Sequence, residues 1–573
     1  MKLESLHIFF KKIGEFQLKY RWLLVILLAA LTVFAAMGLK KFRATSMTEE
    51  VFVNITENMR KNEDRFKELF GSNDTIVLLI ESDDVFKPEV LKMIKEIGSE
   101  LLEKVPYADS VTSITDIDIS VGTEEGIEIK NPFIDGIPED PAELKKAKDF
   151  ILSRKSIVNK LVSSDAKETW LVLSLKATPS KEEWMKTSDK ELMYIMGETA
   201  IDIVTNPKYK SSAYTIKPAG LPYTETEEKI VMNADIKKCV SLSFMCMIIL
   251  LVIFARSLRG TIVPIIATTG AIVSVLGFMG HLNIEGSSEM LSVPIILAMA
   301  LSVGYSIHLV NSFRNSFYAI GKRKEAIIDS IENTGWPLFF TVVTTVASVL
   351  SFLTVDLDPM HWMGYTSAAM VFAVYVYVSI LIPILMSFGK DCPPEQNKSA
   401  IRYKKLDSFF EKFGIAVLKK RKPILVVFVL ATALCLPAVF MITVNMDSFN
   451  FMGTRIPYVK RIYEITHSQL GAYFNYNVML TFKEEDAVKK PENLKKLEEL
   501  SRLISGFKLT KLNNGVPKIF SILDVVKDMN QTMHADDPSF YTIPEDEDLL
   551  TQLLFLYEIS GGETSRWVDD EFR

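Results

Sequence analysis

The chain has 573 residues, of which 48% are hydrophobic and 24% are charged. The hydrophobic content excludes a disordered chain, and the charged content excludes a protein that is apolar throughout. The net charge of −6 comes from 65 basic and 71 acidic residues and gives no reason to expect nucleic-acid binding. Four cysteines without a C-x-x-C pair favour neither a disulfide framework nor a zinc site.

Seven apolar runs are long enough for a membrane-spanning helix, which needs about 20 mostly apolar residues. We interpret the first run as an uncleaved anchor, because it is long for a signal peptide and leads directly into Lys40 and Lys41. The runs are Trp22–Leu39, Cys239–Ala255, Gly260–Gly280, Met290–Val310, Trp336–Val355, Met363–Phe388 and Pro423–Val444.

Basic residues lie on one side of these runs. Residues 1–21, the loop 256–259, the loop after the fourth run and the stretch 390–422 all carry Lys or Arg, whereas His281–Glu289 and Asp356–Trp362 carry none. The positive-inside rule therefore predicts a multi-pass protein of the inner (cytoplasmic) membrane with a cytoplasmic N-terminus. Core helices of a soluble protein would not show this alternation.

The expected fold class is an α-helical polytopic membrane protein with seven spans in a 1+5+1 order and two extracytoplasmic α/β porter-type domains. The expected parts are a cytoplasmic amphipathic helix (1–21), the first span (22–39), a first periplasmic porter-like domain (40–237), a five-span bundle (238–389), a basic cytoplasmic linker with an amphipathic helix (390–422), the seventh span (423–444) and a partial second periplasmic porter-like domain (445–573).

The first outside domain has the pattern of two split β-α-β units. Thr169–Ala177 alternates apolar and polar residues, as a half-buried strand does. The other expected strands are Thr75–Glu81, Asp109–Thr115 and Ser211–Lys217, and helices are expected to begin near Pro88, at Pro141 and at Lys181.

An internal repeat begins again near residue 400. Phe9–Gly14 recurs as Phe409–Gly414, and Ile137–Asp140 recurs as Ile543–Asp546. The second copy is expected to contain a strand at Tyr476–Phe482 and a helix near Pro491, but residues 168 to about 400 have no counterpart in it. We therefore expect a partner bundle, supplied by a separately encoded second half in an adjacent reading frame or by a homo-oligomer.

This layout resembles the resistance-nodulation-division (RND) transporters. Gly220-Leu221-Pro222, Phe254-Ala255-Arg256-Ser257, the segment Ala300–Leu309 and Thr344–Ser348 are most similar to the branch that contains MMPL proteins, hopanoid exporters and Patched. The resemblance implies export of lipidic or hydrophobic small molecules, driven by an ion gradient and without a cofactor. The alternative is a sterol-sensing, Patched-like receptor or sensor that does not transport.

One position departs from the branch, which has Gly-x-Asp-Tyr in the fourth span and uses the aspartate as its proton carrier. Here Ser302 replaces the glycine and Gly304 replaces the aspartate, while Tyr305 is kept. His308 lies one turn from Gly304 on the same helical face. It is either an ion relay or a structural histidine near the cytoplasmic end.

Hydroxyl groups form two stripes at helical spacing. Ser302, Tyr305 and Ser306 form one in the fourth span, and Thr341, Thr344, Thr345 and Ser348 form another in the fifth. Such hydroxyls either bond to backbone carbonyls and pack helices together or line a cation site. The ion-relay candidates are therefore His308, Tyr305, Ser302, Ser306, Thr344 and Thr345.

The remaining polar clusters predict no chemistry. Asp356 and Asp358 are expected to be solvated loop charges, and His534, Asp536 and Asp537 a surface loop rather than a metal site. The sequence has no phosphate-binding Gly-x-x-x-x-Gly-Lys-Ser/Thr motif and no specific pairing of a nucleophile with a base. We therefore expect neither an enzyme nor a catalytic residue, metal or cofactor.

Overall fold

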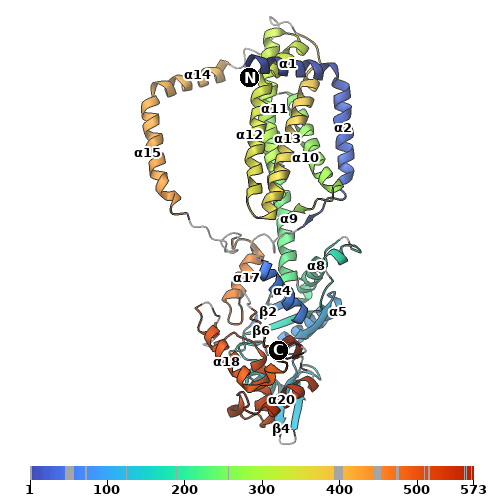
Figure 1. Cartoon of the computed structure of the whole chain (residues 1–573), viewed down its shortest axis with the longest axis vertical. Helices are drawn as coiled ribbons and strands as arrows, with labels where there is room; N and C mark the ends of the chain where they lie inside the picture. The colour runs from blue at the N-terminus through green and yellow to red at the C-terminus, as the bar shows by residue number, and fades with distance from the viewer. Residues whose placement is uncertain are drawn as a thin grey trace. The chain divides into compact units, whose positions relative to one another are not determined.

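The computed structural model describes residues 3–45, 57–70, 74–123, 126–179, 181–188, 190–255, 257–288, 290–392, 404–442, 453–472, 477–508, 510, 512–513, 516–560, 562, 564–569 and 571–572 (Figure 1). The chain divides into two compact units. The membrane unit comprises Met1–Asn54 and Ile230–Val444, and the outer unit comprises Ile55–Lys229 and Asn445–Arg573.

Seven helices of the described residues are long and apolar enough to cross a membrane, and each predicted apolar run contributes to one of them. The fold class is therefore confirmed as an α-helical polytopic membrane protein. The helices are α2 (Arg21–Gly38), α9 (Leu221–Ala255), α10 (Leu258–His281), α11 (Ser292–Ile320), α12 (Arg323–Leu350, continued by the 3-10 helix η2, Ser351–Thr354), α13 (Asp358–Met386) and α15 (Arg421–Val439).

The helices α10, α11, α12 and α13 pack against one another, and α2 packs on α10 (Figure 1). The two amphipathic helices expected before spans are α1 (Leu3–Lys19) and α14 (Lys404–Lys419). The residues of α15 are not buried against any other described part of the chain. A short parallel pair, β1 (Ala44–Thr45) with β8 (Gly286–Ser287), joins two loops of this unit.

The helix α1 lies against the first half of α12 rather than being covered only by lipid. The Phe10 ring is 5% exposed and occupies the space where a Cβ atom of Gly335 would stand. Phe9 and Phe16 remain exposed on α1. One face of α1 is therefore held by protein, and the other is free to enter the membrane surface.

Backbone atoms of α2 and α10 approach each other closely. A Cβ atom added to Gly277 would meet the carbonyl group of Ala35, and one added to Gly280 would meet the carbonyl oxygen of Gly38. Small residues allow this approach, and in membranes such packing replaces the hydrophobic effect as the force between helices. The spacing of these four residues therefore fixes where α2 crosses α10.

The first part of the outer unit is an antiparallel sheet in the order β3-β6-β2-β7. Its strands are β2 (Thr75–Ser82), β3 (Ala108–Thr112), β6 (Glu168–Leu175) and β7 (Tyr214–Ala219). The helix α5 (Pro88–Lys104) connects β2 to β3, and α8 (Leu192–Val204) lies between β6 and β7. This is the predicted pair of split β-α-β units. The hairpin β4 (Ile119–Thr123) with β5 (Gly126–Lys130) and the helix α6 (Pro141–Leu152) are inserted between β3 and β6.

Alternate residues of β2 enter two different cores. Ile76 and Leu78 are fully buried in a core that includes Ile94 of α5, whereas Leu79 contacts Ile465 and Leu470 of the second copy. Alternation is expected because successive side chains of a strand point to opposite faces. Both faces of this sheet are therefore covered, one by the first copy and the other by the second.

Residues of the outer unit from 445 onward are mainly helical. They form α17 (Pro457–His467), α18 (Pro491–Ser505), α19 (Ile522–Met533) and α20 (Glu547–Ile559), with a short hairpin of β9 (Leu512–Asn513) and β10 (Val516–Pro517). The smaller elements of the unit are α4 (Glu57–Phe70), α7 (Lys181–Trp184), η1 (Pro207–Tyr209), η5 (Ala487–Lys489), η6 (Pro538–Phe540) and η7 (Thr564–Arg566).

One sequence prediction for this unit is confirmed only at its start, and another is wrong. The helix expected from Lys181 is the single turn α7, and the helix between β6 and β7 is α8 instead. The Thr187 hydroxyl bonds to the Trp184 carbonyl, and such local bonds compete with helix continuation. The strand expected at Tyr476–Phe482 is not formed over 477–482, while 473–476 lie outside the described residues. A strand forms only where another pairs with it, and none of the described strands pairs with this segment.

Polar contacts join segments of the outer unit that are far apart in the sequence. The guanidinium of Arg154 donates two hydrogen bonds of 2.8 Å to the carboxylate of Asp536. The buried Glu168 carboxylate accepts the backbone N–H groups of Gln469 and Leu470 at 3.1 and 2.9 Å. Charge-assisted bonds of this kind are stronger than neutral ones, so they fix the second copy on the sheet of the first.

The repeated Ile-Pro-Glu-Asp segment has the same local role in both copies. Asp140 caps α6 by accepting the Ala142 N–H at 3.2 Å, and Asp546 caps α20 by accepting the Asp548 N–H at 3.3 Å. Aspartate is among the preferred residues at this position because its carboxylate satisfies an otherwise unpaired N–H group.

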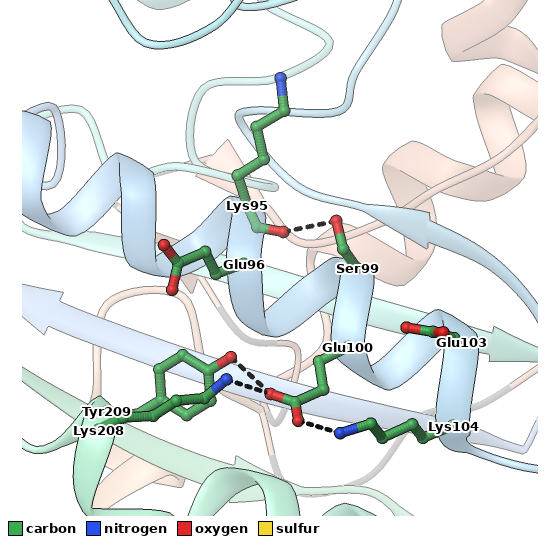
Figure 2. Close-up of a pocket in the computed structure, with 8 residues that line it drawn as sticks. All are labelled: Lys95, Glu96, Ser99, Glu100, Glu103, Lys104, Lys208 and Tyr209. Carbon is green, nitrogen blue, oxygen red and sulfur yellow. Dashed lines mark hydrogen bonds and ion pairs between the residues drawn. The ribbon is translucent and has the colours of Figure 1, made fainter.

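One carboxylate attaches η1 to α5 (Figure 2). Glu100 accepts hydrogen bonds from Lys104, from Lys208 at 2.6 Å and from the Tyr209 hydroxyl at 2.8 Å. These bonds favour the ionised form, and they lower the pKa of Glu100 to about 2.

The close approach of α2 and α10 predicts different effects for two identical substitutions. Gly277→Ala forces the backbones apart and should destabilise the protein by about 1–3 kcal/mol, as overpacking does. The matched control is Gly304→Ala, because no described heavy atom lies within 4 Å of the Cβ position there. Thermal unfolding in detergent micelles measures both. Equal stability of the two variants would show that this backbone contact is absent.

The low pKa of Glu100 predicts a loss of stability in acid. Because the pKa falls from 4.5 to about 2 on folding, the stabilisation is complete above pH 4.5 and disappears as the pH falls towards 2. Glu100→Gln should therefore weaken the acid dependence of the melting temperature in this range. Glu103→Gln on the same helix is the control. A wild-type profile in the Glu100→Gln protein contradicts the proposed contacts.

Candidate functional site

The interior of the membrane unit contains a hydroxyl group shared by three helices. The Tyr377 hydroxyl of α13 lies 2.7 Å from Oγ1 of Thr32 on α2 and 2.6 Å from Oγ of Ser274 on α10. The Tyr377 side chain is 4% exposed. Gly270 makes room for it, because a Cβ atom at Gly270 would collide with the Tyr377 ring.

A second polar contact joins α10 to α11. Thr268 donates a hydrogen bond to Ser302, and both side chains are buried. Thr268 and Ser274 are six residues apart, which is about 9 Å along the helix axis. The two contacts therefore place hydroxyl groups at two depths along the same helix.

Two of the predicted relay residues have buried hydroxyls that no described group satisfies. Ser306 is fully buried and Tyr305 is 3% exposed, and neither the Ser306 Oγ nor the Tyr305 OH has a hydrogen-bond partner among the described residues. Ser306 lies one turn beyond Ser302 on the same face of α11. An unsatisfied buried hydroxyl costs about 1–3 kcal/mol, so each of these two groups has the capacity to bond to a further polar partner.

Gly304, which stands where the resembling branch carries its aspartate, has room for a side chain. No described heavy atom lies within 4 Å of the Cβ position of Gly304. His308, four residues further along the same face, has an exposed side chain. The structure therefore places Gly304 and His308 together, but on a more open face of α11 than the buried Ser302, Tyr305 and Ser306.

The threonines predicted on the fifth span bond to their own helix. Thr344 donates to the carbonyl oxygens of Phe340 and Thr341, and Thr345 donates to that of Thr341 at 2.7 Å. Thr344 is exposed and Thr345 half-buried. These contacts agree with a structural role, in which hydroxyls of a span bond to backbone carbonyls, and not with a cation site.

Carboxylates are absent from the predicted apolar runs of all seven spans. Asp329 and Glu332 of α12 precede the Trp336–Val355 run, and Asp329 accepts a hydrogen bond of 2.6 Å from Ser316. Hydroxyl oxygens can donate and accept hydrogen bonds or contribute ligands to a partly dehydrated cation. They cannot release a proton near neutral pH, so His308 is the titratable candidate of the fourth span.

The clusters that were expected to be inert have separate structural contacts. Asp536 pairs with Arg154, the His534 ring stacks on Phe540 with a centroid distance of 3.7 Å, and Asp537 caps η6. Asp358 is 78% exposed. The described residues contain no group of three His, Cys, Asp or Glu arranged to hold a metal ion.

The depression drawn in Figure 2 lies on the outer unit and has a volume of about 410 Å³. Its charged lining consists of three lysines (Lys95, Lys104 and Lys208) and three glutamates (Glu96, Glu100 and Glu103). Because Glu100 is already paired and six of the eight lining residues are charged, this depression does not have the chemistry of a lipid site.

Sequence reasoning missed Thr32, Thr268, Ser274 and Tyr377. A mid-span tyrosine needs a partner for its hydroxyl, so Tyr377 carried a usable signal. The sequence contains no signal for the partners of Tyr377, because Thr32, for example, is 345 residues away from it in the chain.

Comparison with known proteins agrees with this architecture. A membrane protein of Methanocaldococcus jannaschii, whose name states nothing more about it, is 22% identical over 386 residues, covering 66% of this chain and 92% of that protein. Residues 53–423 match the MMPL family, a range that includes the first outer domain and the bundle α10–α13. This match covers more than half of the chain, and the chain therefore belongs to the MMPL family of membrane proteins.

Proposed function

We propose that the protein is a transporter of the RND type that exports lipidic or hydrophobic molecules from the inner membrane, driven by an ion gradient. The observation that carries the proposal is the family match across both the outer α/β domain and the span bundle. The proposed substrate class, lipidic or hydrophobic molecules, is inferred from membership of the MMPL family. The energy source is a gradient because the sequence contains no nucleotide-binding motif.

Within the bundle, the proposed ion path runs along α11. Ser302, Tyr305 and Ser306 supply hydroxyl oxygens, two of which have no described protein partner. His308 is the proposed proton-carrying group at the open face. Thr344 and Thr345 of α12 keep the bonds to their own helix and take no part in this path. Buried or intramembrane polar groups that are not satisfied by protein are expected where ions or water pass.

A second bundle is proposed to complete the active assembly, as a homo-oligomer or a separately encoded half. Support comes from the relative in Methanocaldococcus jannaschii. The matched region is 66% of this chain but 92% of that relative. That relative is therefore about as long as one repeat. Such pseudo-symmetric transporters place their path between paired bundles. The mass of the reconstituted assembly, measured by light scattering, distinguishes one bundle from two.

Removing the hydroxyls of Tyr305 and Ser306, which have no described partner, tests whether they serve transport or the stability of the fold. Tyr305→Phe and Ser306→Ala should leave the melting temperature unchanged or higher, because each removes a buried hydroxyl without a described partner. Ser302→Ala, the control, loses the bond from Thr268 and should lose about 0.5–1.5 kcal/mol of stability.

Transport of a fluorescent phospholipid in reconstituted vesicles, under an imposed proton or sodium gradient, measures the functional effect. Tyr305→Phe and Ser306→Ala should reduce gradient-driven transport by about tenfold, the effect of losing one interaction of about 1.4 kcal/mol in the rate-limiting step. Undiminished transport in both variants removes these hydroxyls from the ion path. Absence of wild-type transport under either gradient contradicts the proposed function itself.

The vacant space at Gly304 allows a gain-of-function test of proton coupling. Gly304→Asp should fit, because no described atom occupies its Cβ position, and proton-driven transport should be equal or higher. His308→Ala should reduce it. Full proton-driven transport by His308→Ala would eliminate His308 as a necessary relay.

The proposed orientation is tested by labelling single cysteines from outside the cell. Probes in 57–70 or 457–467 should react, and probes in 315–330 should not, because positive loops remain in the cytoplasm. External labelling of 315–330 would contradict the proposed orientation of the chain in the membrane.

A further inference from the structure

Three arginines from three different helices converge at the C-terminal end of α13. Arg21 is the first residue of α2, Arg259 is the second residue of α10, and Arg323 is the first residue of α12. All three contact the segment from Met386 to Lys390. The chain therefore gathers guanidinium groups from distant sequence positions at one end of the bundle.

Arg323 is the most firmly placed of the three. Its Nη1 donates to the Met386 carbonyl at 3.2 Å, and its Nε donates to the Lys390 carbonyl at 3.0 Å. The guanidinium also lies 4.7 Å from the centre of the Phe317 ring. A Cβ atom at Gly389, whose φ is +134°, would lie 2.8 Å from Nε of Arg323. Glycine at 389 therefore allows the backbone to bend around this side chain.

Arg259 and Arg21 approach Phe388. Arg259 donates to the Phe388 carbonyl, and the Arg21 guanidinium lies 4.5 Å from the centre of the Phe388 ring. A guanidinium has five N–H donors. Arg323 uses two for the α13 end and Arg259 uses one, so donors remain on every member of this arginine cluster (Arg21, Arg259 and Arg323).

The cluster carries more positive charge than its described surroundings neutralise. The end of α13 supplies about half a negative charge. The Asp391 carboxylate accepts the backbone N–H of Arg323 at 2.9 Å. Among the described residues, the three guanidiniums make no ion pair within 4.0 Å, whereas Arg154 and Arg461 of the outer unit each pair with a carboxylate. Capping of carbonyls alone does not require three cations.

An aromatic residue gives the depth of the cluster in the membrane. Trp22 follows Arg21 and packs against Phe388 with a centroid distance of 5.4 Å. Tryptophan at the end of a span lies at the level of the lipid headgroups. The guanidiniums therefore stand at the depth of the phosphates, and the planar fork of arginine matches phosphate oxygens in pairs.

We propose that Arg21, Arg259 and Arg323 form a binding site for the phosphate of an anionic phospholipid, at the junction of α2, α10, α12 and α13. Basic pockets between spans bind such headgroups through the same chemistry. A lipid bound there holds the ends of α2, α10 and α12 together and so stabilises the bundle at the end where these three helices begin.

The test uses the full chain in nanodiscs of phosphatidylcholine, with or without phosphatidylglycerol. Phosphatidylglycerol should raise the melting temperature of the wild type. Its apparent affinity, from titration of the lipid fraction, should fall about fivefold for Arg21→Gln or Arg259→Gln, the ratio that about 1 kcal/mol per charge gives. The matched control is the double variant Lys40→Gln/Lys41→Gln, which removes two charges at the other end of α2 and should keep the wild-type response.

Three outcomes overturn the proposal. If the lysine variant loses the response as the arginine variants do, the effect is general surface charge. If the arginine variants are less stable in both lipids but keep the full phosphatidylglycerol increment, the arginines only cap α13. If inorganic phosphate stabilises the protein in pure phosphatidylcholine as well as phosphatidylglycerol does, the site binds a free anion. Arg21→Gln keeps the test decisive if Arg259→Gln fails to fold, because Arg21 makes only the ring contact with this segment.

Discussion

The membrane unit depends on how closely helix backbones can approach α10. Gly277 and Gly280 let α2 lie directly on α10, and Gly270 leaves space for the Tyr377 ring from α13. Only at these separations can the hydroxyls of Thr32 and Ser274 both reach the Tyr377 hydroxyl. The hydrogen-bonded contact between three helices thus depends on glycines, which have no side chain to keep the helices apart. In lipid, where apolar surfaces gain little by meeting one another, contact of this kind determines which helices associate.

The outer unit is organised by a different force. There, water makes apolar burial favourable, and each face of the sheet is covered by residues from a different copy of the repeat. Hydrophobic packing alone does not specify register. The paired bonds from Arg154 to Asp536, and those from the N–H groups of Gln469 and Leu470 to Glu168, require particular orientations. Together they determine where the second copy sits on the first.

Much of this architecture could be predicted because its signals are local. Length and hydropathy locate the spans, and strand alternation locates β6. The repeated Ile-Pro-Glu-Asp segment is visible in the sequence, and the structure shows that Asp140 and Asp546 cap a helix in each copy. The strand expected at Tyr476–Phe482 failed because a strand needs a partner, which composition does not reveal. The site was predictable only in part. Ser302, Tyr305 and Ser306 are buried as a helical stripe suggests, but the partners of Tyr377 come from helices that only the fold brings together.

A glycine at 304, in place of the aspartate that the resembling branch carries, changes what the bundle can do with charge. A carboxylate in a span can hold a proton or a cation, at the cost of removing a charge from water. Gly304 removes that cost and leaves its space open, while α11 retains two buried hydroxyls that lack a described partner. Neutral oxygens bind a proton weakly, but they can solvate an ion that passes without being held. For the proposed ion path, the energetic consequence is a lower cost of removing charge from water and weaker binding of the ion than a carboxylate relay would give. In the proposed function, the proton-carrying group is therefore His308, at the open face of α11.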